Sequence, residues 1–162
     1  MLLYIKHFED LSADELYSIL KLRSEVFILE QKSFYQDCDD KDRSALHVWF
    51  EDKGAIAAYL RVLYEPGSDT ASVGRVIAVK RRCGIGTKIL REGIRIISEE
   101  TNATRITIHA QLYAQKFYET LGFKQDGIPF MDAGIQHVPM TLYLNRTVHS
   151  QISDADGNSS SD

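Results

Sequence analysis

The stretch Arg81-Arg82-Cys83-Gly84-Ile85-Gly86-Thr87 stands between a predicted strand, residues 72–79, and a predicted helix that begins near Gly86. A glycine-containing loop that leads into a helix presents unpaired backbone N–H groups and the positive end of the helix dipole. Lys80 and Lys88 add positive charge on either side. The stretch is therefore typical of a site for an anion such as a phosphate or pyrophosphate.

Two familiar phosphate motifs do not match this loop. The Walker motif requires lysine and then Ser or Thr after its last glycine, whereas Gly86 is followed by Thr87 and then Lys88. The dinucleotide fingerprint requires a third glycine or alanine where Ile89 stands. The remaining pattern, R-x-x-G-x-G from Arg81 to Gly86, is also compatible with a tight basic turn that binds nothing.

Hydrophobic periodicity places the loop in an α/β domain with a mixed sheet. Strands are predicted at 2–8, 45–51, 55–64, 72–79, 104–111, 123–125 and 137–144. A first helix follows the capping box of Ser12 and Glu15, a second follows the loop with Ile89, Leu90, Ile94 and Ile97 inward, and a third spans 113–121, ended by Gly122. A strand, helix and strand between residues 72 and 111 favour a right-handed parallel crossover beside an antiparallel hairpin.

Length and composition indicate one domain. The chain has 162 residues, 44% hydrophobic and 26% charged, which suits a single domain with its own core. Its net charge of −4 argues against nucleic acid as a partner. Residues 150–162 contain three acids and no bases. We expect this acidic tail to be disordered, because it has little apolar surface to bury, and residues 1–149 to form the domain.

Other sequence features indicate a cytoplasmic protein. Two cysteines, Cys38 and Cys83, are too few for a secreted disulfide framework. No apolar run is long enough for a membrane span, and the N-terminal residues do not have the order of a signal peptide. Histidines and carboxylates show no metal-ligand spacing, so no metal is expected.

Together with a second segment, the loop resembles the GNAT N-acetyltransferase superfamily. The second segment is Tyr113-Ala114-Gln115-Lys116-Phe117-Tyr118-Glu119-Thr120-Leu121-Gly122-Phe123, in the order and spacing of that family. A narrower resemblance, to the ElaA-like branch, is carried by 22–31, 35–37, 58–61, 73–76, 110–111 and Gly134-Ile135-x-His137. The resemblance implies a mostly antiparallel sheet with a splayed parallel central pair, flanked by helices.

The resemblance also implies that acetyl-CoA is the co-substrate. Its pantetheine is expected along the strand backbone of Ile77, Ala78 and Val79. Its pyrophosphate is expected on Arg81, Arg82, Cys83, Gly84, Ile85, Gly86 and Thr87. Gln111, Phe117 and Tyr118 complete the expected cofactor contacts, although the family commonly has Asn where Gln111 stands. A backbone N–H near Val79 is expected to polarise the acetyl carbonyl.

Tyr118 and Glu30 are the candidates for acid–base chemistry. In the resembled family, a tyrosine at the position of Tyr118 often protonates the departing CoA thiolate, whereas the helix pattern alone predicts a core aromatic. Glu30 and Arg23 both fall on the apolar stripe of the first helix, where a charge is costly unless it is paired or lines a wet cleft. The branch resemblance favours a cleft carboxylate for Glu30, which would take the proton of the amine directly or through water. For Arg23 a structural role is favoured, either snorkelling at the helix end or an internal ion pair.

Acceptor contacts are expected from Glu30, Gln31, Tyr35, Arg61, Arg75, His109 and His137. Arg61 and Arg75 would face each other in a simple hairpin register, which is unfavourable unless Glu30, another acid or a substrate carboxylate lies between them. Alternatively, the register slips or both side chains point to solvent. The acidic residues favour a cationic amine as the acceptor, and the two arginines favour a carboxylate.

The predicted function is transfer of an acetyl group to a primary amine of a small molecule or peptide by direct attack. No membrane or nucleic-acid partner is expected, and a homodimer is compatible with the resembled family. One alternative is a non-catalytic acyl-CoA-binding or regulatory module with the same fold. A second alternative is an ordinary nucleotide-phosphate binder.

Overall fold

A computed structural model describes residues 1–146 of the chain. Its elements are β1 (Leu2–His7), η1 (Phe8–Asp10), α1 (Ala13–Arg23), the π-helical η2 (Ser24–Glu30), η3 (Lys41–Ser44), β2 (Leu46–Asp52), β3 (Ala55–Tyr64), β4 (Thr70–Ala78), α2 (Ile85–Glu100), β5 (Arg105–Gln111), η4 (Leu112–Ala114), α3 (Gln115–Glu119), β6 (Lys124–Gln125), β7 (Phe130–Asp132) and β8 (Ile135–Tyr143). The expected acidic tail, residues 150–162, lies outside the described residues.

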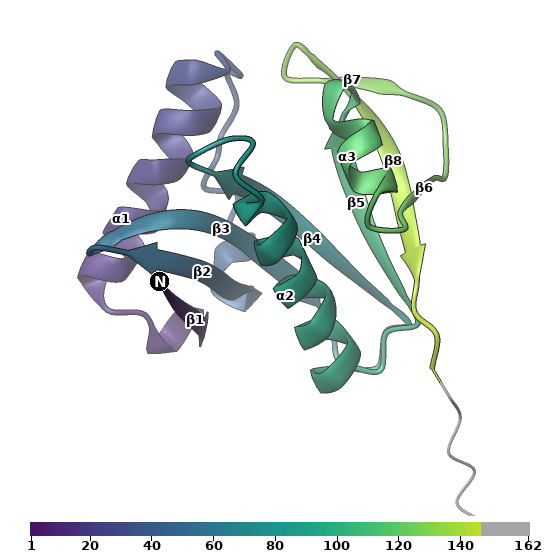
Figure 1. The fold of residues 1–162 in the computed structure, drawn as a ribbon, viewed down its shortest axis with the longest axis horizontal. Coiled ribbons are helices and arrows are strands. Elements are labelled where there is room, and N and C mark those ends of the chain that lie inside the picture. The colour runs from purple at the N-terminus through teal and green to yellow at the C-terminus, as the bar shows by residue number, and fades with distance from the viewer. Residues whose placement is uncertain (147–162) are drawn as a thin grey trace, which may run out of the picture.

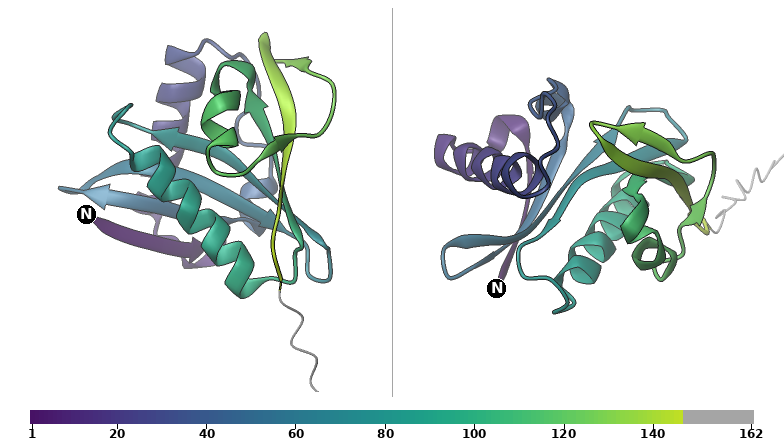
Figure 2. Two further views of the ribbon diagram at one scale, coloured as in Figure 1. Left: turned by 45° about the vertical axis from the view of Figure 1, so that its right-hand side comes forward. Right: turned by 90° about the horizontal axis from the view of Figure 1, so that it is seen from above.

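The strands form one sheet in the order β1-β2-β3-β4-β5-β8-β6, and β7 also pairs with β8. The β4–β5 pair is parallel, and the other recorded pairs are antiparallel. Helix α2 connects the parallel pair and packs on one face of the sheet, while α1 lies on the opposite face (Figures 1 and 2). The predicted mixed α/β architecture is confirmed.

Two apolar clusters fill the two faces. The larger one packs Ile85, Ile89, Leu90, Ile96 and Ile97 of α2 against sheet residues such as Leu60, Ile106 and Met140. Ile94, expected on the same inner face, is only partly buried. The smaller cluster joins Ile19 and Phe27 to Trp49, Tyr59 and Ile77. The second face is therefore covered by α1 and η2 together.

Helix α1 begins as predicted and ends differently. The Glu15 N–H donates to Ser12 Oγ at 3.1 Å and the Ser12 N–H donates to Glu15 Oε2 at 2.9 Å, so the capping box is present. From Ser24 onward the chain winds as a π-helix, and the Gln31 N–H donates to the Val26 carbonyl five residues earlier. Because the wider turn breaks the 3.6-residue repeat, Glu30 lies exposed instead of on the apolar stripe.

Strands β4 and β5 are hydrogen-bonded neighbours only at their beginnings, from Thr70 opposite Arg105 to Ser72 opposite Thr107. Beyond these pairs the two strands diverge (Figures 1 and 2). On its other edge β4 contains a bulge, because Arg75 and Val76 both lie opposite the single residue Leu60. Of the alternatives left open for Arg61 and Arg75, the register therefore slips, and Arg61 lies opposite Gly74.

The C-terminal third contains one predicted feature and one that was missed. Helix α3 ends in a Schellman motif: the Phe123 N–H donates to the Tyr118 carbonyl, and Gly122 has a φ of 93°. The short strand β7 was not predicted, because three residues after a proline carry too little periodic signal. It turns into β8 through Ala133 and Gly134, which both have positive φ, as a tight hairpin requires.

Candidate active site

The diverging ends of β4 and β5 lie beside a surface pocket of about 460 Å³. Its lining comes from four separate parts of the chain: Glu30, Gln31, Arg81, Gln111, Tyr113 and Ile135. Four of these six residues, all but Tyr113 and Ile135, were expected at the site. The fold therefore brings the end of η2, the basic loop and the end of β5 to one place.

The loop before α2 leaves its backbone donors available. Gly84 is the N-cap, with a φ of 80°, and in the described chain neither a side-chain cap nor an acid in the first turn serves this helix end. The Lys88 N–H is the first to join the helical ladder, by donating to the Gly84 carbonyl at 3.1 Å. The N–H groups of residues 85–87 precede that ladder. Lys80, Arg81, Arg82 and Cys83 lie exposed around them.

Gly86, at the end of this loop, packs closely against Phe117 of α3. A Cβ placed on Gly86 would lie 3.5 Å from Phe117 Cζ and 3.6 Å from Ala78 Cβ. Phe117 packs edge-to-face on Tyr118, with ring centroids 5.3 Å apart, and Tyr118 packs in the same way on Phe123 at 5.9 Å. These contacts place the Tyr118 ring in an aromatic cluster beside the start of α2.

The Tyr118 phenol is protonated at neutral pH. Burial, with a smaller contribution from Tyr113, raises the pKa of Tyr118 to about 12. At neutral pH the phenol therefore keeps a proton that it can donate to an incoming group.

One backbone N–H at the end of β4 faces the space between the diverging ends of β4 and β5, but it is not the N–H of Val79. The Val79 N–H donates to the Ala57 carbonyl of β3 at 3.0 Å. Because successive residues of a strand direct their N–H groups to opposite edges, the N–H of Ala78 faces away from β3, toward the diverging side. The donor expected near Val79 is thus best assigned to Ala78.

Two polar contacts span the pocket from the end of η2. Glu30 Oε2 lies 3.5 Å from Arg81 Nη2, and both side chains are largely exposed, so this ion pair is weak. Gln111 Nε2 donates to Gln31 Oε1 at 2.7 Å. Glu30 and Gln31 therefore contact the basic loop and β5, respectively.

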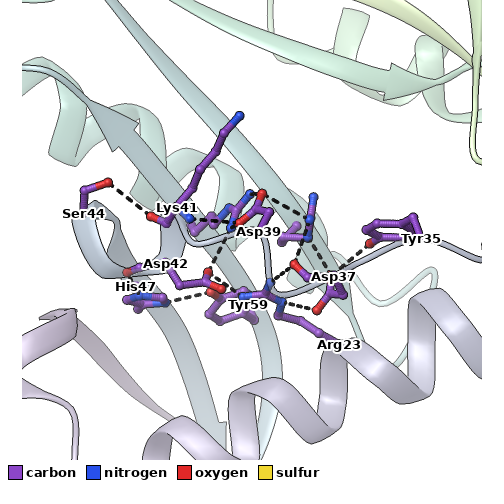
Figure 3. Close-up of polar contacts among 11 residues, drawn as sticks. Arg23, Tyr35, Asp37, Asp39, Lys41, Asp42, Ser44, His47 and Tyr59 are labelled. Atoms are coloured by element: carbon purple, nitrogen blue, oxygen red, sulfur yellow. Dashed lines mark hydrogen bonds and ion pairs between the residues drawn. The ribbon is translucent and has the colours of Figure 1, made fainter.

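Arg61 and Arg75 belong to an internal cluster of charges. Figure 3 shows this cluster around Arg23, Asp37, Asp39 and Asp42. Three arginines, Arg23, Arg61 and Arg75, pair with three acids, Asp37, Asp39 and Asp42. Asp39 binds Arg61 through both oxygens, at 2.8 and 2.5 Å, and also lies 3.5 Å from Arg75. The anion between the two arginines is therefore another acid of this chain, one of the alternatives that the sequence left open.

Arg23 has a structural role, as expected: of the two alternatives it forms the internal ion pair, and it is fully buried. Its Nε donates to Asp37 Oδ2 at 2.9 Å and its Nη1 to Asp42 Oδ1 at 2.6 Å. Tyr35 adds its hydroxyl to Asp37 Oδ1 at 2.9 Å, and the Arg75 guanidinium lies 5.1 Å from the centre of its ring. Tyr35 and Arg61 are thus held within the charge cluster and do not line the pocket.

The cluster shifts the titration of its members. Hydrogen bonds from Arg61 hold the pKa of Asp39 far below its usual range. Burial lowers the pKa of His47, which is fully buried against Asp42 and Tyr59. Because the Asp42 carbonyl only accepts, His47 Nε2 carries the proton and donates, while Nδ1 accepts from the Tyr59 hydroxyl.

His109 and His137 flank Phe130 of β7. Phe130 lies edge-to-face with His109 at 5.1 Å and stacks on His137 at 5.7 Å. His137 is opposite Gln111 in the sheet register, and its Nδ1–H donates to the Ile135 carbonyl at 2.8 Å. His137 therefore adjoins two pocket-lining residues, Gln111 and Ile135, whereas His109 contacts Phe130, and neither histidine lines the pocket. Sequence reasoning missed Phe130 because its strand was missed.

These features define the class of protein. Residues 8–144 match the acetyltransferase (GNAT) domain, and the chain belongs to this family of acyl-CoA-dependent acetyltransferases. In that family the fold uses acetyl-CoA. In the described part of the chain, no helix is both long and apolar enough to span a membrane.

Within the family, the similar proteins include ElaA. A UPF0039 protein of Schizosaccharomyces pombe is 33% identical over 143 residues, covering 86% of this chain and 95% of that protein. Protein ElaA of Escherichia coli is 29% identical over 141 residues, covering 83% and 91%. The crystal structure of an acyl-CoA N-acyltransferase from Pseudomonas aeruginosa has a TM-score of 0.81 at 29% identity, covering 88% of this chain and 99% of that chain. The predicted superfamily and ElaA-like branch are confirmed.

Proposed function

We propose that the protein transfers the acetyl group of acetyl-CoA directly to a primary amine. One observation carries this proposal: the anion donors at the start of α2, the open edge of β4 and the Glu30 carboxylate lie together where β4 and β5 diverge. Tyr118 packs against Phe117, which lies beside Gly86 of the same helix start. The backbone donors of 85–87, with Arg81 and Arg82, bind the pyrophosphate. The backbone of Ile77–Val79 binds the pantetheine as an added strand would.

Each chemical step has a residue to support it. An amine is mostly protonated at neutral pH, so Glu30 first accepts its proton, directly or through water. The amine nitrogen then forms a bond to the acetyl carbon while the Ala78 N–H polarises the carbonyl oxygen. As the carbon–sulfur bond breaks, Tyr118 donates its proton to the departing thiolate. The nitrogen, now bonded to the acetyl carbon, loses its second proton, which restores the Tyr118 phenol through water, and Glu30 releases its proton to solvent. The products are an acetylated amine and free CoA.

The contacts of Cys83 support direct attack over an acyl-cysteine intermediate. Its Sγ lies 3.0 Å from the Lys80 carbonyl, within its own loop. That loop is the expected pyrophosphate site, so the thiol lies at the wrong end of acetyl-CoA to receive the acetyl group. We therefore assign Cys83 to the loop that binds the pyrophosphate and not to the acetyl transfer.

Charge favours a cationic amine as the acceptor. Arg61 and Arg75, which would otherwise recognise a substrate carboxylate, are neutralised by acids of the same chain. Glu30 supplies the carboxylate among the pocket-lining residues. A small-molecule amine and a peptide amine both fit this description.

The test is free-thiol release from acetyl-CoA with a panel of amines: an alkyl diamine, a peptide N-terminus, a lysine side chain and an aminoglycoside. We expect thiol release that depends on the amine. Binding of acetyl-CoA in calorimetry without amine-dependent release would instead identify a non-catalytic acyl-CoA-binding module. Displacement of CoA by ATP in a thermal-shift assay would identify a nucleotide-phosphate binder.

Substitution of Glu30 tests its role within this proposal. Glu30→Gln is expected to lower kcat/KM about 100-fold at neutral pH, a usual contribution of a general base, and to leave the Kd of acetyl-CoA unchanged. Glu25→Gln, in the same π-helical segment, is the matched control and should behave as wild type. Equal rates for the two variants would assign the proton transfer to another group.

A further inference from the structure

Arg75 holds a backbone conformation that its residue type disfavours. It occupies the bulge of β4 with a φ of 52°, in the left-handed region that L residues adopt only at a cost. Glycine adopts that region freely, yet the neighbouring Gly74 does not have a positive φ. Contacts from outside the strand must therefore stabilise the bulge.

The Arg75 side chain makes such contacts with the acidic loop, residues 35–42. Its Nε donates to Asp37 Oδ1 at 2.7 Å, and its Nη2 donates to the Asp37 carbonyl at 3.0 Å. The guanidinium also lies over the Tyr35 ring, within the range of a cation–π interaction. Backbone and side-chain oxygens of one residue thus hold the guanidinium in one orientation.

The acidic loop is itself anchored to two other elements. Arg23 of α1 binds both the carboxylate and the carbonyl of Asp37, each at 2.9 Å. Arg61 of β3 binds Asp39 through two hydrogen bonds. Both of these arginines are buried. Their hydrogen bonds fix the position of the acidic loop, and the loop in turn orients Arg75.

We propose that Arg75 is a positioning residue for the thioester and does not bind the acceptor. Its contacts with the acidic loop stabilise the bulge in β4. The bulge lies between the part of β4 that pairs with β5 and the part that diverges from it. Residues 76–78 then present an open backbone edge, including the Ala78 N–H, to the acetyl carbonyl. This inference rests on the proposed function. It assigns Arg75 to the positioning of the cofactor, whereas the sequence predicted a contact with the acceptor.

Two substitutions of Arg75 separate positioning from direct contact. Arg75→Ala removes the ion pairs, but alanine at positive φ has the same energetic cost as arginine. The backbone at residue 75 should therefore leave the left-handed conformation, and the bulge should be lost. The Kd of acetyl-CoA is then expected to rise about tenfold, with the KM of the amine little changed. In Arg75→Gly the left-handed conformation costs little, so binding should recover to within about threefold of wild type. A residue that contacts the acceptor would lose function equally in both variants.

Amide hydrogen exchange gives a readout that needs no activity. The Val79 N–H, bonded to Ala57 beyond the bulge, should exchange faster in Arg75→Ala than in Arg75→Gly. Arg95→Ala, which removes an exposed arginine with two carboxylate partners on α2, should match wild type in both measurements. Equal behaviour of the alanine and glycine variants at residue 75 would overturn the inference. Failure of the wild type to bind acetyl-CoA would overturn the proposed function, and the Val79 exchange rates would still decide the role of Arg75.

Discussion

At the scale of single residues, the chemistry depends on how neighbours set protonation. The Tyr118 ring packs between Phe117 and Phe123, and burial raises the pKa of its phenol to about 12 and keeps it protonated. Glu30 is exposed beside Arg81, where a carboxylate stays accessible to a cationic amine. In the proposed mechanism, Tyr118 therefore donates a proton and Glu30 accepts one.

Tyr118→Phe tests the donor. Because phenylalanine keeps the packing against Phe117 and Phe123, the Kd of acetyl-CoA should change less than twofold, whereas kcat should fall about 100-fold, the usual contribution of a general acid. Steady-state kinetics and calorimetry measure the two effects. Tyr17→Phe, an exposed tyrosine of α1, is the control. An equal loss of affinity and turnover would contradict the role as acid.

Residue roles could be predicted only where local signals exist. The capping box of Ser12 and Glu15 was predicted from local spacing, and a structural role of Arg23, with an ion pair as one alternative, from the cost of a buried charge. The partners of Arg61 and Arg75 could not be predicted. Their acids lie 22 and 38 positions away in the chain, and no periodicity connects such positions.

At the scale of elements, the start of α2 is the expected pyrophosphate site, and its glycine provides a matched experiment. Gly84 and Gly54 both have a positive φ, 80° and 78°, and both have open space where a Cβ would lie. Gly84→Glu and Gly54→Glu should therefore each destabilise the fold by a similar amount, about 1–2 kcal/mol.

Of the two variants, only Gly84→Glu should weaken the binding of acetyl-CoA. A carboxylate at this position would compete with the pyrophosphate for the free N–H groups of α2, so the Kd of acetyl-CoA should rise about 100-fold or more, as expected for loss of several charge-assisted contacts. Calorimetry measures the affinity, and denaturant unfolding confirms equal stability. Wild-type affinity in Gly84→Glu would mean that the pyrophosphate binds elsewhere.

Most elements were predicted to within one or two residues, because alternating and helical hydrophobic patterns are local. The exceptions are the π-helical end of the first helix, the bulge in β4 and the short strand β7. The π-helical end and the bulge depart from regular geometry, whereas β7 is too short to show a periodic pattern. Each also lies close to the candidate active site, where regular structure gives way to the geometry that a ligand needs.

At the scale of the whole molecule, the charge cluster joins α1, the acidic loop, β3 and β4 and makes stability depend on pH. Burial lowers the pKa of His47, and hydrogen bonds from Arg61 lower that of Asp39. A group whose pKa is lower in the folded state binds protons more readily when unfolded. Stability from such a group is present above its unfolded pKa and is lost as the pH falls below it.

The free energy of unfolding should therefore fall in two stages on acidification. The first begins near pH 6.5, where His47 would titrate in the unfolded chain, with a slope of at most about 1.4 kcal/mol per pH unit. The second begins near pH 4, where Asp39 and Asp42 would titrate. Denaturant unfolding between pH 4.5 and 8 should show the first stage in wild type and lose it in His47→Gln. The same slope in both proteins would contradict the assignment to His47.

The sequence by itself determined the architecture, the basic glycine loop and the family, because hydrophobic repeats, turn residues and motif spacing are local along the chain. Only the tertiary structure decided which charges neutralise one another and which remain in the pocket. Arg61 and Arg75 illustrate the difference, since their role depends on carboxylates that folding brings from a separate loop. Ion pairs depend on distances of a few ångströms between remote segments, and those distances exist only once the core has packed.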